Sequence, residues 1–185
     1  VRITKVKITV IIHDDVVDRT TNGHGMAIEH SFSDLQKLDA GYGRKIPSLT
    51  EVLDYFKNQD ILFHIELKEN NLAVIIEQIV SEKNLTKRVV VSAFNDDDLG
   101  RHGNDPKSSS RWADLDIIKD KLPIALAATN KKILKMGGVT AYIRMAQNVG
   151  AYAMHPEQTA VNEELVMAAH KAGLKVNTWT VNDRA

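Results

Sequence analysis

The sequence predicts an α/β fold in which parallel strands alternate with helices. Short apolar runs end near Lys68, Phe94, Ala128, His155 and Val181, and helical periodicity appears between several of them. This alternation is typical of a sheet built from βα units. The nearest closed architecture is a TIM (β/α)8 barrel, which usually takes about 250 residues. A doubly wound open sheet is the alternative, although no glycine-rich phosphate loop follows any strand.

The composition is that of an ordinary globular protein. Of the 185 residues, 43% are hydrophobic and 26% are charged, with 24 basic and 24 acidic residues in balance. Net charge therefore gives no reason to expect nucleic acid or an anionic membrane as a partner. The lack of cysteine excludes disulfides, thiolate metal sites and a cysteine nucleophile. No apolar run reaches the ~18 residues of a transmembrane segment, and the compartment is left open.

Residues 1–13 are expected to form a β-hairpin. Their apolar and β-branched residues alternate imperfectly, and we expect residues 1–4 to pair with residues 10–13. That pairing would deliver His13 directly to the end of a strand. Residues 4–7 make a poor two-residue turn, because they contain none of the residues that such turns prefer.

Two capping boxes predict helix starts in the next segment. Ser33 with Gln36 would open one short helix. Ser48 with Glu51 would open another, in which the apolar residues at positions 49, 52, 53 and 56 form one buried face.

The remaining elements alternate along a single domain, residues 1–185. We expect strands over residues 61–67, 89–94, 122–128, 151–155 and 175–181. We expect helices over residues 72–83, 141–149 and 163–172. Between the second and third of these strands, residues 96–112 are polar, contain two glycines and a proline, and predict a loop or a poorly ordered insertion.

Three side chains are candidates for chemistry on their pattern alone. His13 is a candidate acid or base, because an imidazole titrates near neutral pH. Glu66 and Lys68 alternate with apolar residues near the end of a strand, so both should point to the same side. If that side is a barrel interior, the pair is costly unless a metal or an anionic substrate completes it. A solvated pair at a sheet edge would give the same pattern.

Four motifs together resemble the glycerophosphodiester phosphodiesterases. HDDVVDRTTNGHG, from His13, resembles that family's HD-x-x-x-DRTT-x-G-x-G signature, and IPSLTEVL, from Ile46, resembles its IPTLEEVL. IELK, from Ile65, and WTVN, from Trp179, resemble two of its strands. The resemblance implies a TIM barrel that hydrolyses glycerophosphodiesters, as small-molecule substrates, to glycerol 3-phosphate and an alcohol.

The resemblance also implies roles for particular residues. His13 would be one of two histidines that act as general acid and base, and Glu66 would bind a divalent metal, calcium or magnesium. Such a hard cation would neutralise charge on the phosphodiester. Lys68 would contact the substrate phosphate. Trp179 would line the substrate pocket or fill the barrel, and Phe94 has a similar standing.

The other polar residues of these motifs are expected to be structural. Local side-chain to backbone bonds should brace the loop that holds His13, through Asp14, Asp18, Arg19, Thr20 and Thr21. His155 lies at a strand end and is a candidate for the second catalytic histidine, but the family does not place that histidine there. Surface or packing positions are expected for His24, His30, His64, His102 and His170.

Several motifs of the family do not occur in this sequence. The family opens with an HRG strand that carries the first catalytic histidine, a PENT helix and an E-x-D strand with two metal ligands, and it closes with a TD-x-P strand. We therefore expect a barrel without its first strand, most of its second and its last, as a portion of a longer polypeptide. Such a portion should aggregate, dimerise or be inactive by itself. The alternative is a non-catalytic barrel that binds phosphate esters or assembles with another chain.

Overall fold

Five parallel strands form the frame of the molecule. The computed structural model describes residues 1–94 and 111–182. Within them the strands are β3 (Phe63–Leu67), β4 (Val89–Phe94), β5 (Ile124–Ala128), β6 (Ala153–Pro156) and β7 (Lys175–Val176). They are hydrogen-bonded in the order in which they occur in the chain. A doubly wound sheet would reverse that order at a switch point, so the barrel-type α/β fold is confirmed and the alternative is wrong for the described strands.

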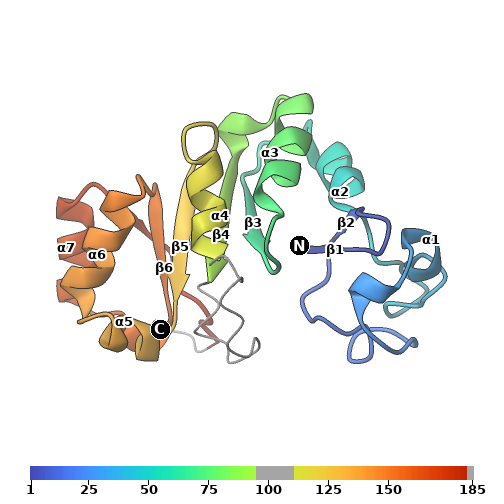
Figure 1. The fold of residues 1–185 in the computed structure, drawn as a ribbon, viewed down its shortest axis with the longest axis horizontal. Helices are drawn as coiled ribbons and strands as arrows, with labels where there is room; N and C mark the ends of the chain where they lie inside the picture. The colour runs from blue at the N-terminus through green and yellow to red at the C-terminus, as the bar shows by residue number, and fades with distance from the viewer. Residues whose placement is uncertain (95–110, 183–185) are drawn as a thin grey trace.

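Helices cover one side of this sheet (Figure 1). They are α3 (Ala73–Glu82), α4 (Arg111–Ile118), α5 (Asn130–Lys135), α6 (Val139–Asn148) and α7 (Glu163–Lys171). On β3 the side chains of Ile65 and Leu67 belong to the core between the helices and the sheet. Because side chains alternate along a strand, Glu66 between them points to the opposite, helix-free side. The largest apolar cluster therefore lies outside the concave face and leaves that face for polar groups.

The N-terminal hairpin is present but shorter than predicted, and the predicted pairing of residues 1–4 with residues 10–13 is wrong in register. β1 (Arg2–Ile3) pairs antiparallel with β2 (Thr9–Val10), in the register Arg2 to Val10. The strand ends at Val10, and not at His13, because the next backbone N–H, that of Ile11, donates to Pro47 at 2.9 Å instead of to the hairpin. A wider turn, in which Lys7 adopts φ 60°, replaces a two-residue turn.

The helices α1 (Phe32–Leu35) and α2 (Leu49–Phe56) differ in how well the sequence predicts them. Ser48 accepts from the Glu51 backbone N–H at 3.1 Å, and the Glu51 carboxylate accepts from the Ser48 N–H at 2.8 Å, so this capping box is confirmed. The predicted cap at Ser33 is wrong. Ser31 caps α1 instead, by accepting from the backbone N–H of Asp34 at 3.1 Å.

Among the later elements, α3, α6 and α7 agree with prediction to within two residues at each end, whereas α4 and α5 were not predicted. The signal for α4 is hidden because two of its buried side chains, Arg111 and Asp114, are charged. Asp114 accepts from the backbone N–H of Leu72 at 3.1 Å. α4 also takes in the last two residues of the predicted loop 96–112; residues 96–110 lie outside the described part of the chain. None of the helices in that described part is long and apolar enough to cross a membrane.

The capping box at α2 gives a first prediction. Ser48→Ala should lower the free energy of unfolding by about 1 kcal/mol, because the backbone N–H of Glu51 loses the Ser48 hydroxyl as its acceptor at the start of the helix. Urea denaturation followed by circular dichroism measures this. Glu51→Gln is the matched control, since glutamine can still accept from the Ser48 N–H and should cost less than half as much. Equal stability of wild type and Ser48→Ala would contradict the assignment.

Candidate active site

Glu66 and Lys68 form an ion pair at the carboxyl end of β3. The Lys68 Nζ lies 2.8 Å from Glu66 Oε1, and the side chains of Lys68 and Glu66 are 13% and 26% exposed respectively. Both point away from the helices, as the alternation along the strand predicts. The pair is therefore shielded from bulk water, which does not agree with a solvated pair at a sheet edge.

His13 is held by a carboxylate in the loop that follows β2. Its Nδ1 lies 2.7 Å from Asp14 Oδ1. Arg19 donates to the same carboxylate, from Nε to Oδ2 at 2.5 Å and from Nη2 to Oδ1 at 3.1 Å. Hydrogen bonds from Arg19, and then from His13, hold the pKa of Asp14 far below its usual range. Asp14 is thus a fixed anion that orients an imidazole whose side chain is 68% exposed.

The rest of this loop is braced by its own backbone. Asp18 accepts from the N–H of Gly25 at 2.9 Å, and the Thr21 hydroxyl donates to the carbonyl of Val17 at 2.8 Å. These are the local side-chain to backbone bonds that the sequence predicts for the segment. Asp14 and Arg19 differ from this prediction. Their hydrogen bonds join side chain to side chain, and through Asp14 they connect to His13.

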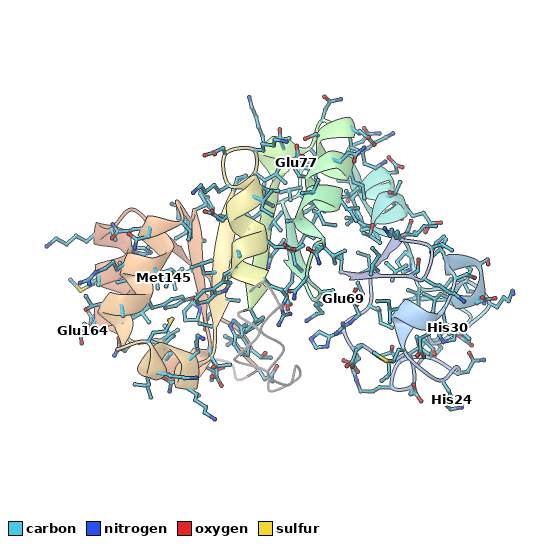
Figure 2. The ribbon with its side chains drawn as sticks, viewed as in Figure 1. His24, His30, Glu69, Glu77, Met145 and Glu164 are labelled. Atoms are coloured by element: carbon cyan, nitrogen blue, oxygen red, sulfur yellow. The ribbon has the colours of Figure 1, made fainter. Side chains whose placement is uncertain are left out.

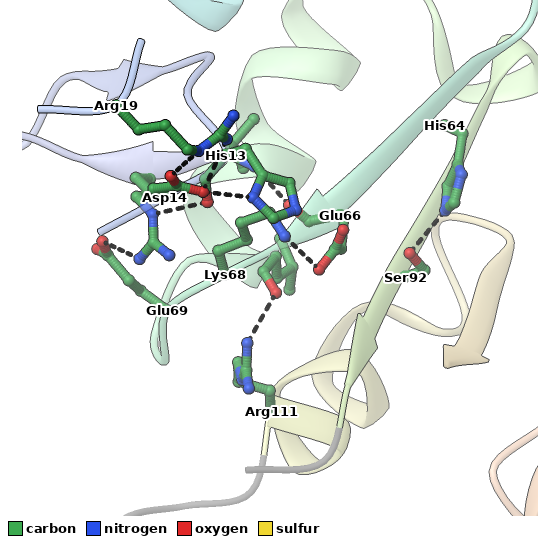
Figure 3. Close-up of polar contacts among 12 residues, drawn as sticks. His13, Asp14, Arg19, His64, Glu66, Lys68, Glu69, Ser92 and Arg111 are labelled. Carbon is green, nitrogen blue, oxygen red and sulfur yellow. Dashed lines mark hydrogen bonds and ion pairs between the residues drawn. The ribbon is translucent and has the colours of Figure 1, made fainter. Parts of the chain in front are cut away.

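Arg2 connects this loop to the end of β3. The Arg2 side chain donates from Nε to the carbonyl of His13 at 3.2 Å and pairs with Glu69 Oε1 at 3.3 Å. Glu69 Oε2 also accepts from the backbone N–H of Ile3 at 3.1 Å. Figure 3 shows His13 at the same end of β3 as Glu66 and Lys68. The structure thus brings together the three side chains that the sequence singled out.

A cavity of about 140 Å³ lies next to Glu66 on the concave side of the sheet. Its lining comes from four strands, β3 to β6, and from the segment just after β7. The residues are His64, Glu66, Ser92, Phe94, Ala127, His155, Asn177, Thr178 and Trp179. The rings of Phe94 and Trp179 meet edge to face, with their centroids 4.9 Å apart. Both aromatic residues that the sequence proposed as pocket residues therefore line the cavity.

Two histidines share this cavity. The rings of His64 and His155 are in edge-to-face contact, with centroids 4.4 Å apart, and His155 is buried. His64 Nε2 lies 2.6 Å from the hydroxyl oxygen of Ser92, and His155 Nε2 lies 3.3 Å from the amide nitrogen of Asn177. The sequence reasoning missed His64, although its position two residues before Glu66 on one strand was the signal that could have found it.

The other described histidines lie away from the cavity. His24 and His30 belong to the N-terminal segment, apart from the sheet (Figure 2). His170 is exposed on α7. His102 falls outside the described residues.

Burial sets the charge of the two cavity histidines. It lowers the pKa of His155 to about 4, with a smaller contribution from the nearby His64. Burial also lowers the pKa of His64, against an opposing effect of the Glu66 carboxylate. The His155 ring is therefore neutral at pH 7, so it offers one N–H donor and one nitrogen acceptor.

The described residues do not gather a complete metal site. Over residues 1–94 and 111–182, no group of three or more His, Cys, Asp or Glu side chains is arranged to hold a metal ion. Glu66 is the carboxylate of the cavity lining, and one of its oxygens already accepts from Lys68.

The amino-acid sequence of the whole chain is similar to those of one protein family. The model of the glycerophosphoryl diester phosphodiesterase family matches residues 1–185. A glycerophosphodiester phosphodiesterase of Caldanaerobacter subterraneus is 31% identical over 194 residues, which cover 98% of this chain and 72% of the relative.

Solved structures agree on the fold. A glycerophosphodiester phosphodiesterase of Agrobacterium tumefaciens aligns over 96% of this chain and 70% of its own, with a TM-score of 0.72 and 19% identity. An Oleispira antarctica phosphodiesterase, solved in complex with the product sn-glycerol-3-phosphate, aligns over 98% of this chain and 70% of its own, with a TM-score of 0.74 and 21% identity.

The depressed pKa of His155 predicts a pH dependence of stability. The unfolded chain binds a proton at this residue near the ordinary pKa of 6.5, whereas the folded chain does so only near pH 4. Stability is therefore full above about pH 6.5 and falls as pH decreases toward 4. The loss should approach roughly 3 kcal/mol, at about 1.4 kcal/mol for each tenfold change in proton affinity.

The measurement is a series of urea denaturation curves between pH 4 and 7.5. His155→Asn should flatten the profile over that window, because the group that the unfolded chain protonates has been removed. The exposed His170→Asn is the matched control and should leave the profile unchanged. An identical pH profile for wild type and His155→Asn would show that His155 does not carry this effect.

Proposed function

This chain belongs to the glycerophosphoryl diester phosphodiesterase family, a family of hydrolases, and on that premise we propose that it cleaves glycerophosphodiesters to glycerol 3-phosphate and an alcohol. The observation that carries the proposal is the convergence of the oriented His13 with the Glu66–Lys68 pair at one end of β3 (Figure 3). The complex of the Oleispira antarctica phosphodiesterase with its product, sn-glycerol-3-phosphate, is consistent with this reaction. A non-catalytic phosphate-ester binder would have no need of an oriented imidazole.

His13 acts as a general acid or base in this proposal. Its Nδ1 faces the Asp14 carboxylate, so the proton on that nitrogen is held and the exposed Nε2 is left to exchange a proton with the reacting oxygen. Asp14 is a positioning residue: it fixes the tautomer and stabilises the imidazolium that forms. Arg19 keeps Asp14 ionised while it does so.

Lys68 contributes positive charge to the phosphate-binding end of the site. Its ammonium is held 2.8 Å from Glu66 and is 13% exposed. A partly buried ammonium beside a single carboxylate keeps two further N–H donors, which suit the nonbridging oxygens of a phosphodiester. Because water is largely excluded, this attraction is stronger than it would be at the surface.

We also propose that hydrolysis requires a divalent cation, calcium or magnesium, with Glu66 as one of its ligands. The support is the family resemblance and the position of this carboxylate in the cavity. Hard cations of this kind take about six or more oxygen ligands. The described residues do not supply such a set, so Glu66 by itself does not make the site, and the roles of His13 and Lys68 above rest on their own contacts.

His13→Gln should lower kcat/KM for glycerophosphocholine by about 100-fold or more, as loss of a general acid or base does. The assay uses the natural polypeptide and measures the glycerol 3-phosphate that it releases. His24→Gln is the matched control, since His24 also pairs with an aspartate, Asp18 at 3.1 Å, but is 87% exposed and away from the cavity. Full activity of His13→Gln would refute its role.

Glu66→Gln tests the metal ligand separately. The amide keeps the shape of the side chain but not the charge, so hydrolysis should be lost at every concentration of added calcium or magnesium. Far-ultraviolet circular dichroism should be unchanged. A chelator should likewise abolish wild-type activity, and the exposed Glu82→Gln should behave as wild type. Metal-independent turnover by the wild type would contradict the cation requirement.

A further inference from the structure

We infer that Arg2 and Glu69 are positioning residues for the proposed reaction. Their ion pair holds the imidazole of His13 at a fixed distance from the ammonium of Lys68, and it therefore controls turnover more than substrate binding. The inference rests on the proposed function and extends it to two residues that are not among the proposed catalytic groups.

The backbone of His13 is anchored by Arg2. The antiparallel pairing of the hairpin ends at Val10, three positions before the histidine. Within the described part of the chain no backbone-to-backbone hydrogen bond holds His13, and its carbonyl accepts from Arg2 Nε at 3.2 Å. Asp14 orients the ring, but it lies on the same loop. The bond from Arg2 is therefore the contact that fixes this loop relative to the sheet.

Glu69 ties the hairpin to the end of β3. It directly follows Lys68 in the chain. Both oxygens of its carboxylate are occupied by β1, since Oε1 lies 3.3 Å from Arg2 Nη1 and Oε2 accepts from the backbone N–H of Ile3 at 3.1 Å (Figure 3). The backbone N–H of Lys68 also donates to the carbonyl of Val1 at 3.2 Å. The hairpin and the proposed phosphate-binding lysine are thus held as one unit.

The shape of the guanidinium makes this connection specific. It is planar and carries separate donors, so that Nε of Arg2 bonds the loop of His13 while Nη1 bonds Glu69. A lysine has its charge on one nitrogen at the end of a flexible chain and does not reproduce this fork. Because Arg2 is buried, water is a poor substitute for either acceptor.

This geometry predicts an effect on turnover. Lys68 follows β3 directly and is held by the sheet when Arg2 is changed, whereas the loop of His13 is free to shift. A displacement of about 1 Å between reacting groups can lower a rate by about 100-fold. Loss of an interaction that is equal in the ground state and the transition state would instead raise KM. A change at Arg2 should therefore lower kcat and leave KM nearly constant.

The test measures kcat and KM of the natural polypeptide for glycerophosphocholine. Arg2→Lys should lower kcat by about 10- to 100-fold and leave KM within about twofold of wild type. Glu69→Gln should show the same split and takes the place of Arg2→Lys if the latter does not fold. Arg88→Lys is the matched control, because Arg88 also donates to backbone carbonyls, those of Ile61 at 2.9 Å and Lys57 at 2.6 Å, but at the opposite end of β3. It should keep the wild-type kcat and KM.

A second readout separates positioning from a loss of folded protein. When Arg2→Lys is combined with His13→Gln, kcat should fall no further than in His13→Gln alone, because the group to be positioned is already absent. A smaller folded fraction would lower kcat by the same factor in both backgrounds. That additive result, a wild-type kcat in folded Arg2→Lys, or an equal loss in Arg88→Lys would overturn the inference.

The placement of the imidazole can also be measured without turnover. In proton–nitrogen NMR spectra the ring signals of His13, assigned by their absence in His13→Gln, should shift in Arg2→Lys and Glu69→Gln but not in Arg88→Lys. Unshifted signals in both of the first two variants would overturn the inference. Shifted signals in a protein that hydrolyses no glycerophosphodiester would instead overturn the proposed function and leave the positioning of His13 standing.

Discussion

The site depends on one ion pair, between the buried Arg2 and the partly exposed Glu69. Arg2 is 5% exposed and holds both the Glu69 carboxylate and the carbonyl of His13. An arginine buried at this level must have its N–H groups satisfied, since an uncompensated buried charge costs several kcal/mol. That requirement fixes the short hairpin against the end of β3. The proposed acid or base and the proposed phosphate-binding pair are therefore neighbours because of a contact that takes no part in the chemistry.

The two faces of the sheet have different roles: one forms the apolar core and the other carries the polar groups of the cavity. The helix-facing positions of each strand are apolar and form the larger core, which supplies most of the stabilising burial. The opposite positions carry His64, Glu66, Ser92 and His155 into one cavity. Ser92 and His155 are buried there, and their burial is tolerated because each has a hydrogen-bond partner. Burial lowers the pKa of His155, and that of His64, before any ligand arrives.

The secondary structure was predictable wherever the local signal and the tertiary packing agree. The Ser48–Glu51 capping box and the helix over 73–82 follow from local hydrogen bonds and from a continuous apolar face. The prediction failed where packing overrode the pattern. α4 buries Arg111 and Asp114, whose charge is typical of solvent-facing residues, and α1 starts from Ser31 rather than Ser33.

The sequence alone determined the fold class, the family resemblance and the three candidate site residues, His13, Glu66 and Lys68. Each of these depends on signals that are local in the chain: strand periodicity, a motif of fixed spacing, and the alternation of Glu66 with apolar neighbours. Only the tertiary structure decided that His64 and His155, far apart in the chain, touch each other, and that Asp14 orients His13 rather than the loop backbone. Contacts of this kind join strands through the register of the sheet, and no local pattern encodes which side chains that register brings face to face.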